Sequence, residues 1–297
     1  MAYWTNTELI PFLIKFSIAF IVLLYGSITD LKTREVPDWI NYGLIISGVA
    51  LNGIFSAILS DWSYIIQSAI GLAIFFCIGW LMFYAGQWGG GDSKMLMGLG
   101  AMIGLNIKFD EPQFLAGFLI NAMLVGAIYG LLWSMIIAAK NWKKFRINLS
   151  KVSKEKKIVV VKKIILTIVI IAAFSVLFVN DYMTKTALLG MALIIAISFY
   201  LWISIRAVEK ISMLKYVEPM KLTEGDWIVK DIVYNGKKIV GPKDLGIEKN
   251  QIKILIGLYK KGKIRKVLIK EGIPFVPSFF LAFIVTLIFG NLIWMII

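Results

Sequence analysis

The sequence predicts an all-α polytopic membrane protein of about eight transmembrane helices, with a small α+β cytoplasmic domain before the last helix. Of its 297 residues, 59% are hydrophobic and only 17% are charged, and the mean hydropathy is +0.80. Soluble domains average roughly 45–50% apolar and about 25% charged residues. The apolar excess is therefore too large for a globular core, and it indicates a chain that lies largely in lipid.

Eight hydrophobic segments approach the length needed to cross a bilayer, which is about 20 apolar residues for a helix. They cover residues 9–30, 39–59, 63–86, 92–107, 113–139, 163–180, 184–206 and 273–297. The fourth segment is short, and the sixth and seventh are separated only by Asn180-Asp181 and their neighbours. An even number of spans predicts that both termini lie on the same side of the membrane.

The basic residues predict the orientation, because cytoplasmic loops carry an excess of lysine and arginine. Residues 140–163 contain ten Lys or Arg and a single acid, Glu155, whereas residues 209–272 contain 15 Lys or Arg and 8 Asp or Glu. Eight spans place both segments on one side, which we assign to the cytoplasm of a multi-pass plasma-membrane protein. The net charge of +14 then belongs to loops that face anionic headgroups. We therefore expect a lipid bilayer, and no nucleic acid, as a partner.

Residues 208–272 form a polar segment with α+β character. The pair Asn235-Gly236 between two apolar runs predicts a β-hairpin. The following stretch, GIEKNQIKILIGLYKKGK, predicts a short amphipathic helix that ends at Gly262, and IRKVLIK predicts a returning strand. The acids of this segment, at positions 226, 231 and 244, are expected to be solvated or turn residues.

These patterns divide the chain into four parts. Residues 1–139 form a membrane core that holds the candidate acids, and residues 140–207 form a basic cytoplasmic loop with two further spans. Residues 208–272 form a small soluble cytoplasmic domain, and residues 273–297 form a final transmembrane helix.

The amino-acid inventory narrows the possible chemistry. The sequence has no histidine and one cysteine, Cys77, which excludes an internal disulfide and a zinc site of the CxxC type. We expect no metal and no cofactor. Catalysis would then depend on Asp, Glu, Lys, Ser, Thr or Tyr.

Two acids stand at the cytoplasmic ends of apolar helices, where charged groups are costly and are often functional. They are Asp30, at the end of the first span, and Asp92, at the start of the fourth. The second and third spans form a hairpin between them, so the two carboxyl groups can meet. Paired carboxyl groups share one proton and activate water in aspartic peptidases.

Three glycines precede the second acid. Gly89, Gly90 and Gly91 have no Cβ, so they permit unusual backbone angles and the close approach of an extended substrate. We expect them to delay the start of the fourth span until Asp92. The simpler alternative is an ordinary tight loop with Asp92 as a helix cap and Asp30 as the polar end of a span.

Three separated stretches resemble the type IV prepilin peptidases, and among them the archaeal preflagellin peptidases, which are intramembrane GxGD aspartyl proteases. They are SITDLKTREVPDWINYGLI, GGGDSKMLMGLGAMIG and EGIPFVPSFFLAF, in the family's order. The charged segment before the last span resembles the small soluble domain of archaeal members. Residues 110–210 match only as hydrophobic spans with a basic loop.

The resemblance implies an enzyme. Asp30 and Asp92 become the catalytic pair, and Gly89 and Gly91 become the motif glycines. The substrates become precursor proteins with type IV pilin-like signal peptides, whose short basic leader is cut at the cytoplasmic face. Glu35 and Asp38 are candidates for attracting that leader, although ordinary loop charges explain them better.

Departures from related families limit this reading. Bacterial members that also methylate their product carry paired CxxC motifs, which are missing here, so we expect no methyltransferase activity. The presenilin branch has a Pro-Ala-Leu motif, which is also missing. Two other classes stay open, an ion-coupled transporter that uses the two acids as proton or cation sites and a catalytically inactive membrane scaffold.

Overall fold

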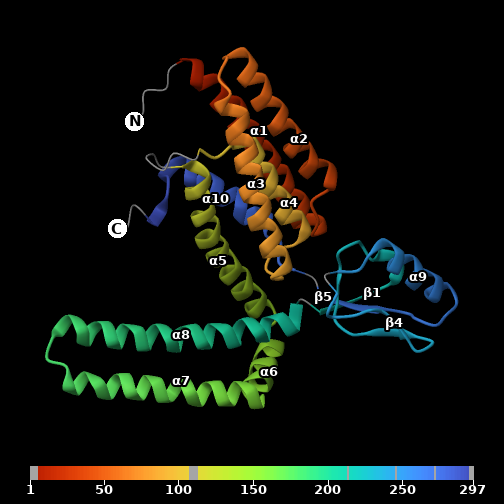
Figure 1. Ribbon diagram of the computed structural model, residues 1–297. Helices are drawn as coiled ribbons and strands as arrows, with labels where there is room; N and C mark the ends of the chain where they lie inside the picture. Colours follow the sequence, from red (N-terminus) through yellow and green to blue (C-terminus); the bar gives the residue numbers. More distant parts are fainter. Residues whose placement is uncertain (1–5, 107–112, 213, 245, 271, 294–297) are drawn as a thin grey trace. The chain divides into compact units, whose positions relative to one another are not determined.

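The computed structural model describes residues 6–106, 113–212, 214–244, 246–270 and 272–293 (Figure 1). Its α-helices are α1 (Asn6–Thr33), α2 (Asp38–Ile58), α3 (Ser63–Tyr84), α4 (Gly90–Ile103), α5 (Phe114–Lys140), α6 (Trp142–Ser153), α7 (Lys156–Ser175), α8 (Tyr182–Ser212), α9 (Lys249–Lys260) and α10 (Val276–Phe289). Its strands are β1 (Leu214–Val217), β2 (Trp227–Ile228), β3 (Ile232–Tyr234), β4 (Lys237–Val240) and β5 (Val267–Lys270). The chain forms two compact units, one of Met1–Gly130, Val217–Val267 and Glu271–Ile297, the other of Leu131–Tyr216 and Leu268–Lys270.

The predicted class of polytopic helical protein with a small sheet-containing segment is confirmed. Six helices in the described residues are long and apolar enough to span a membrane, namely Leu9–Thr33, Asp38–Ile58, Ser63–Tyr84, Phe114–Lys140, Lys156–Phe178 and Tyr182–Ile211. The other two expected spans, 92–107 and 273–297, correspond to helices of 14 residues each, α4 and α10. At about 1.5 Å per residue, such a helix covers only about 21 Å of a core that is about 30 Å thick.

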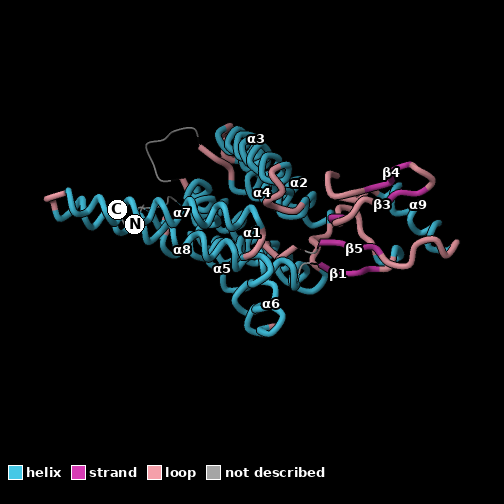
Figure 2. Tube along the Cα trace, turned by 90° about the horizontal axis from the view of Figure 1, so that it is seen from below, coloured by secondary structure: helices cyan, strands magenta, loops and turns pink. Residues whose placement is uncertain are grey.

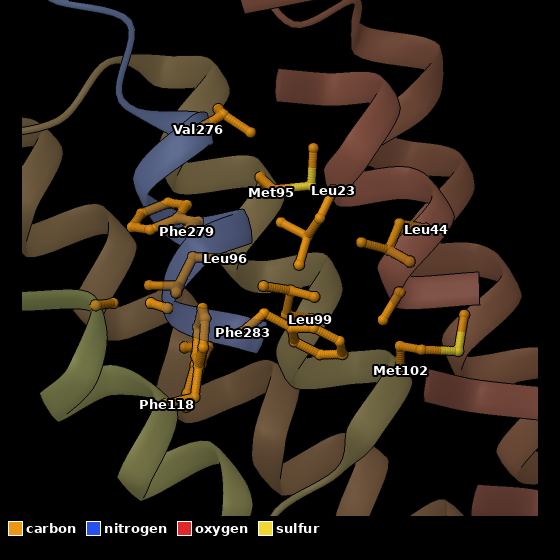
Figure 3. Packing of buried hydrophobic residues seen from close by; sticks show 14 of the residues in the cluster. Leu23, Leu44, Met95, Leu96, Leu99, Met102, Phe118, Val276, Phe279 and Phe283 are labelled. Carbon is orange, nitrogen blue, oxygen red and sulfur yellow. The ribbon is translucent and has the colours of Figure 1, made fainter. Parts of the chain in front are cut away.

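The core of the first unit is built around α4, and nine of the fourteen residues of this helix are buried. Figure 3 shows the apolar side chains of this core. Met95, Leu96, Leu99 and Met102 belong to α4, and the side chains from α1, α2, α5 and α10 that pack around them include Leu23, Leu44, Phe118, Phe279 and Phe283. Helix α2 approaches so closely that a Cβ at Gly48 would lie 2.6 Å from the backbone nitrogen of Met102. The short helix α4 is therefore held on several sides by other helices.

A buried amide joins α5 to α10 within this unit. The Asn121 side chain donates to the carbonyl oxygen of Gly290 at 2.7 Å and to Thr286 Oγ1 at 2.9 Å, and it accepts from the Leu292 amide at 3.1 Å. These bonds satisfy the end of α10, where backbone carbonyls lack partners within the helix. The last helix is thereby attached to the membrane core at its C-terminal end.

The second unit corrects the predicted loop at 140–163, which is mostly helical. Phe145 and Val152 are seven residues apart on α6, so they lie on one face of that helix. Phe145 packs on Ala207 and Val208 of α8, and Val152 packs with residues of α7 and α8. The burial of this apolar face explains why a strongly basic segment is ordered as a helix. Figures 1 and 2 show α7 and α8 side by side as a hairpin.

The predictions for the polar segment are confirmed. Strands β3 and β4 are antiparallel, and the turn residues Asn235 and Gly236 have φ values of 50° and 75°. Positive φ at both central positions is the geometry that an Asn-Gly pair favours in a two-residue hairpin. Helix α9 is followed by Gly262, at φ 70°, and β5 then lies next to β1. The strands in the described residues all lie between positions 214 and 270, and they are the magenta segments of Figure 2.

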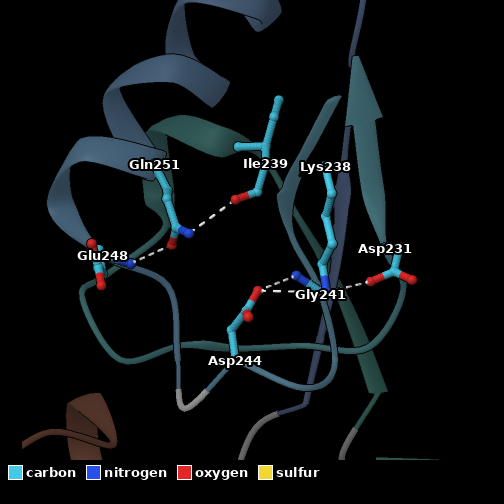
Figure 4. Close-up of polar contacts among 7 residues, drawn as sticks. All are labelled: Asp231, Lys238, Ile239, Gly241, Asp244, Glu248 and Gln251. Carbon is cyan, nitrogen blue, oxygen red and sulfur yellow. Dashed lines mark hydrogen bonds and ion pairs between the residues drawn. The ribbon is translucent and has the colours of Figure 1, made fainter. Parts of the chain in front are cut away.

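The acids of this segment make local contacts, as expected (Figure 4). Lys238 Nζ lies 3.0 Å from Asp231 Oδ1 and 3.9 Å from Asp244 Oδ2, and the latter oxygen accepts the Gly241 amide at 2.7 Å. Gln251 of α9 donates to the carbonyl oxygen of Ile239 at 2.9 Å. These bonds hold the start of α9 against β4.

Candidate active site

Asp30 lies in the last turns of α1 and is buried. Its Oδ2 accepts a hydrogen bond from the backbone N–H of Val276, at 3.0 Å. Val276 begins α10 and Pro277 follows it, and the first N–H groups of a helix have no carbonyl partner within that helix. The carboxyl group of α1 therefore supplies the acceptor for the N-terminus of α10.

Asp92 lies in the first turn of α4, and its Oδ2 accepts the backbone N–H of Gly89 at 2.8 Å. This bond is the half of a capping box in which an acid reaches back to the residue before the helix. The expectation that the glycines delay this helix until Asp92 is wrong. Helix α4 begins at Gly90, and Gly89 has ordinary extended angles, φ −72° and ψ 165°.

The ends of α1, α4 and α10 meet at one level. A Cβ at Gly26, one turn before Asp30, would lie 2.8 Å from Met95 Cε and 3.4 Å from Val276 Cγ1. Met95 is one turn after Asp92, so the two acids face the same junction. Figure 3 shows Met95 and Val276 beside this junction. Gly26 and Met95 therefore bring together the turns of α1 and α4 that carry the two acids.

Charged side chains from the α1–α2 connection, from the start of α2 and from α4 lie near the acids. Arg34, at φ 64°, donates to the carbonyl oxygen of Gly272 at 3.4 Å and is within electrostatic reach of Asp30. Lys94 Nζ, two residues after Asp92, lies 2.6 Å from Asp38 Oδ1 and 5.2 Å from the centre of the Tyr42 ring. The carboxylate of Asp38 is thus paired within the chain. This pairing favours the interpretation of Asp38 as an ordinary loop charge over a role in attracting the basic leader.

Three groups in or near the candidate site were not predicted from the sequence. The Val276 amide carries no side-chain signal, so only the fold could reveal it. Tyr129 of α5 lies within electrostatic reach of Asp30. Lys15 is buried within the span of α1 and bonds to α2 and α4. A search for every ionisable residue inside the predicted spans, and not for acids alone, would have found Lys15.

Fold and site together define a polytopic membrane protein with two neighbouring carboxyl groups between the ends of three helices. Within the described residues, no group of three or more Cys, Asp or Glu side chains is arranged to hold a metal ion. Residues 17–131 match the family model described as the type IV leader peptidase family, and this segment contains both acids and all three glycines. These residues therefore belong to that family, which confirms the resemblance.

Individual relatives agree with this assignment. The chain is 43% identical to a preflagellin peptidase of Methanocaldococcus jannaschii over 100 residues, which are 34% of this chain and 41% of that protein. It is 40% identical to a preflagellin peptidase of Methanococcus maripaludis over 111 residues, 37% of this chain and 46% of that protein. These matches span less than half of the relatives' lengths. No solved structure matches the chain.

A more distant relative matches along nearly the whole chain. The similarity to the prepilin peptidase EppA of Methanothermobacter thermautotrophicus covers 94% of this chain and 95% of that protein, at 19% identity. This alignment covers so much of the chain that it includes most of the second unit and of the polar segment.

Proposed function

We propose that this protein is a membrane aspartic endopeptidase that removes the basic leader peptide from preflagellin-like or type IV pilin-like precursors at the cytoplasmic face. One observation carries the proposal. Two acids 62 residues apart in the sequence, Asp30 and Asp92, lie on turns of α1 and α4 that pack together beside the start of α10. Both acids belong to the segment that matches the type IV leader peptidase family.

The proposed reaction uses the carboxyl pair to activate water. Like charges this close do not both ionise readily, so the pair holds one proton between its two members. The ionised carboxylate takes a proton from water as the water oxygen attacks the peptide carbonyl carbon. The protonated carboxyl group donates its proton to the carbonyl oxygen. The carboxyl group that took the proton from water then gives it to the leaving nitrogen, and the other, now ionised, takes a proton from one hydroxyl of the tetrahedral diol. The C–N bond breaks, the two products are the carboxylic acid and the amine, and the pair again holds one proton.

Backbone contacts prepare the acids for this role. The Val276 amide holds Asp30 and the Gly89 amide holds Asp92, so neither carboxyl group depends on a mobile side chain for its orientation. A carboxylate that accepts a backbone N–H in a largely buried site has little freedom to rotate. Such preorganisation reduces the rearrangement that the reaction requires.

Gly90 and Gly91 are proposed to leave room for the extended precursor. Their own surroundings do not demand glycine, because a Cβ at Gly90 would lie 3.8 Å from Phe83 and one at Gly91 would lie 3.5 Å from Val36. Both distances are ordinary van der Waals contacts, and both residues lie in a helix, where alanine is favoured over glycine. Close approach of a substrate backbone explains why glycine stands there.

The test is cleavage of a tagged precursor whose leader ends in glycine, in membranes that contain the full chain. Wild-type protein is expected to shorten the precursor. Asp30→Asn and Asp92→Asn are each expected to reduce the rate by at least about 10³-fold, because the two acids act as one catalytic unit and the loss of either disables it. Asp181→Asn, at an exposed acid that bonds only near itself, is the matched control.

Two results would contradict the proposal. Cleavage at the wild-type rate by either catalytic variant would exclude the pair as the catalytic group. Absence of cleavage by the wild type, together with proton movement in sealed vesicles that depends on Asp30 and Asp92, would favour the ion-coupled transporter.

A further inference from the structure

Lys15 is a cation buried within the membrane-spanning part of α1, and only 7% of its surface is exposed. Its Nζ donates to Asn52 Oδ1 of α2 at 3.1 Å and to the carbonyl oxygen of Ile103 at 3.2 Å. The ammonium group also lies 5.4 Å from the centre of the Tyr64 ring of α3, a cation–π contact. A charge at this depth is costly unless it is well bonded, so its contacts indicate a specific role.

The contacts of Lys15 converge on the C-terminal end of α4. Ile103 is the last residue of this helix, and the last carbonyl groups of a helix have no partner within it. Asn52 Nδ2 donates to the carbonyl oxygens of Ala101 and Met102, each at 3.1 Å. Lys15 adds the carbonyl oxygen of Ile103, and a cation is favoured at this end of the helix dipole. Lys15 and Asn52 together therefore cap α4 from two other helices.

The opposite end of α4 carries Asp92. Lys15 and Asp30 lie 15 residues apart on α1, while Asp92 and Ile103 lie 11 residues apart on α4. The two helices are antiparallel, because Lys15 is bonded to the end of α4, whereas Gly26, later in α1, lies next to Met95, nearer the start of α4. The contact between Gly26 and Met95 lies between these two points. Because α4 is one continuous helix, a slip along its axis moves Asp92 by the same distance relative to Asp30. A slip of one residue is about 1.5 Å.

We propose that Lys15 is a positioning residue that sets the axial position of α4 and thereby the alignment of Asp92 with Asp30. This inference rests on the proposed function for its catalytic consequence. The ammonium group acts at one end of α4 and the chemistry occurs at the other, so Lys15 does not touch the reacting atoms. Asn52 supports it by orienting the ammonium group and by bonding to the two preceding carbonyl groups.

The first test measures the alignment without activity. The full chain carries Cys77→Ser together with Asp30→Cys and Asp92→Cys. The rate at which the two introduced thiols form a disulfide under a mild oxidant reports how often the two positions meet. Lys15→Met, which keeps the length of the stem and removes the charge, is expected to slow this rate at least about fivefold. Lys15→Arg, which keeps a cationic donor, is expected to restore most of it. Lys162→Met, the same change at an exposed lysine of α7, is expected to leave it unchanged.

The second test measures cleavage kinetics with both acids in place. Lys15→Met is expected to lower kcat at least about tenfold with KM within about twofold, because the substrate contacts remain and only the catalytic pair is misaligned. Lys15→Arg is expected to recover most of kcat. If Lys15→Met lowers the Tm but keeps both the cross-linking rate and kcat, Lys15 only stabilises the fold and the proposal is wrong. Because cross-linking needs no substrate, the proposed function can fail while this result stands.

Discussion

Asp30 accepts a hydrogen bond from the backbone N–H of Val276, a residue 246 positions later in the chain, at 3.0 Å. The first helix and the last helix of the chain are thereby joined at the candidate site. Asp30 thus has a structural role, as the acceptor for the start of α10, beside its proposed catalytic one. The two roles can be separated by substitution.

Asp30→Asn is expected to keep the fold while it removes activity. The asparagine oxygen still accepts the Val276 N–H, so the free energy of unfolding should fall by about 1 kcal/mol or less. Asp30→Leu removes the acceptor and leaves this N–H without its partner, which costs about 1–3 kcal/mol. Thermal unfolding of the two variants in the same detergent measures the difference. Equal Tm values for the two variants would show that the bond contributes little.

Gly90→Ala and Gly91→Ala are expected to fold as well as the wild type and to bind precursor poorly. The free protein has room for a methyl group at both positions. If the precursor backbone passes there, the methyl group collides with it, and overpacking of this kind costs about 1–3 kcal/mol. KM is therefore expected to rise about tenfold, with an unchanged or higher Tm. An unchanged KM in both variants would remove the glycines from the substrate site.

Gly48→Ala is expected to separate α2 from α4. The added Cβ would lie 2.6 Å from the backbone nitrogen of Met102, which cannot rotate away as a side chain could, so we expect a loss of about 1–3 kcal/mol in stability. Gly43→Ala is the matched control on the same helix, because nothing lies within 4 Å of its added Cβ. Alanine there should be neutral or stabilising by up to about 1 kcal/mol. Equal Tm values for the two variants would contradict the close packing of α2 on α4.

Glu155 is expected to contribute to stability in a pH-dependent way. It lies between α6 and α7, where a hydrogen bond from Lys210 lowers the pKa of its carboxyl group, with a further contribution from the charge of Arg206. Because the folded pKa lies below the unfolded value, the contribution is present above the unfolded pKa and is lost as the pH falls through the folded one. The Tm difference between wild type and Glu155→Gln should therefore be small at about pH 7, since exposed ion pairs are weak, and should shrink as the pH falls below the unfolded pKa of about 4.3. A difference that grows on acidification would contradict this assignment.

Much of the architecture follows from local patterns in the sequence. Long apolar runs predict the six helices that are long enough to cross a membrane, because lipid demands continuous backbone hydrogen bonding. The Asn235-Gly236 pair predicts its hairpin, since few other residues adopt positive φ at both turn positions. Both candidate acids were also predicted from the sequence, because a charge at the end of an apolar helix is conspicuous.

Other features depended on tertiary contacts. The basic segment 140–163 reads as a loop in sequence, and it is helical because Phe145 and Val152 are buried against other helices. Helix α4 starts at Gly90, although glycine disfavours helices, because it is enclosed on several sides and because Asp92 satisfies the Gly89 amide. Packing and capping outweighed the local preference of the glycines in this position.

The sequence by itself determined the membrane class and the family of residues 17–131, and it predicted the two candidate acids. These properties depend on composition and on short motifs, which can be read along one chain. Only the tertiary structure decided that Asp30 bonds to the start of α10 and that Lys15 caps the end of α4. Backbone N–H and carbonyl groups are the same at every residue, so their partners are chosen by which helix ends the fold brings together.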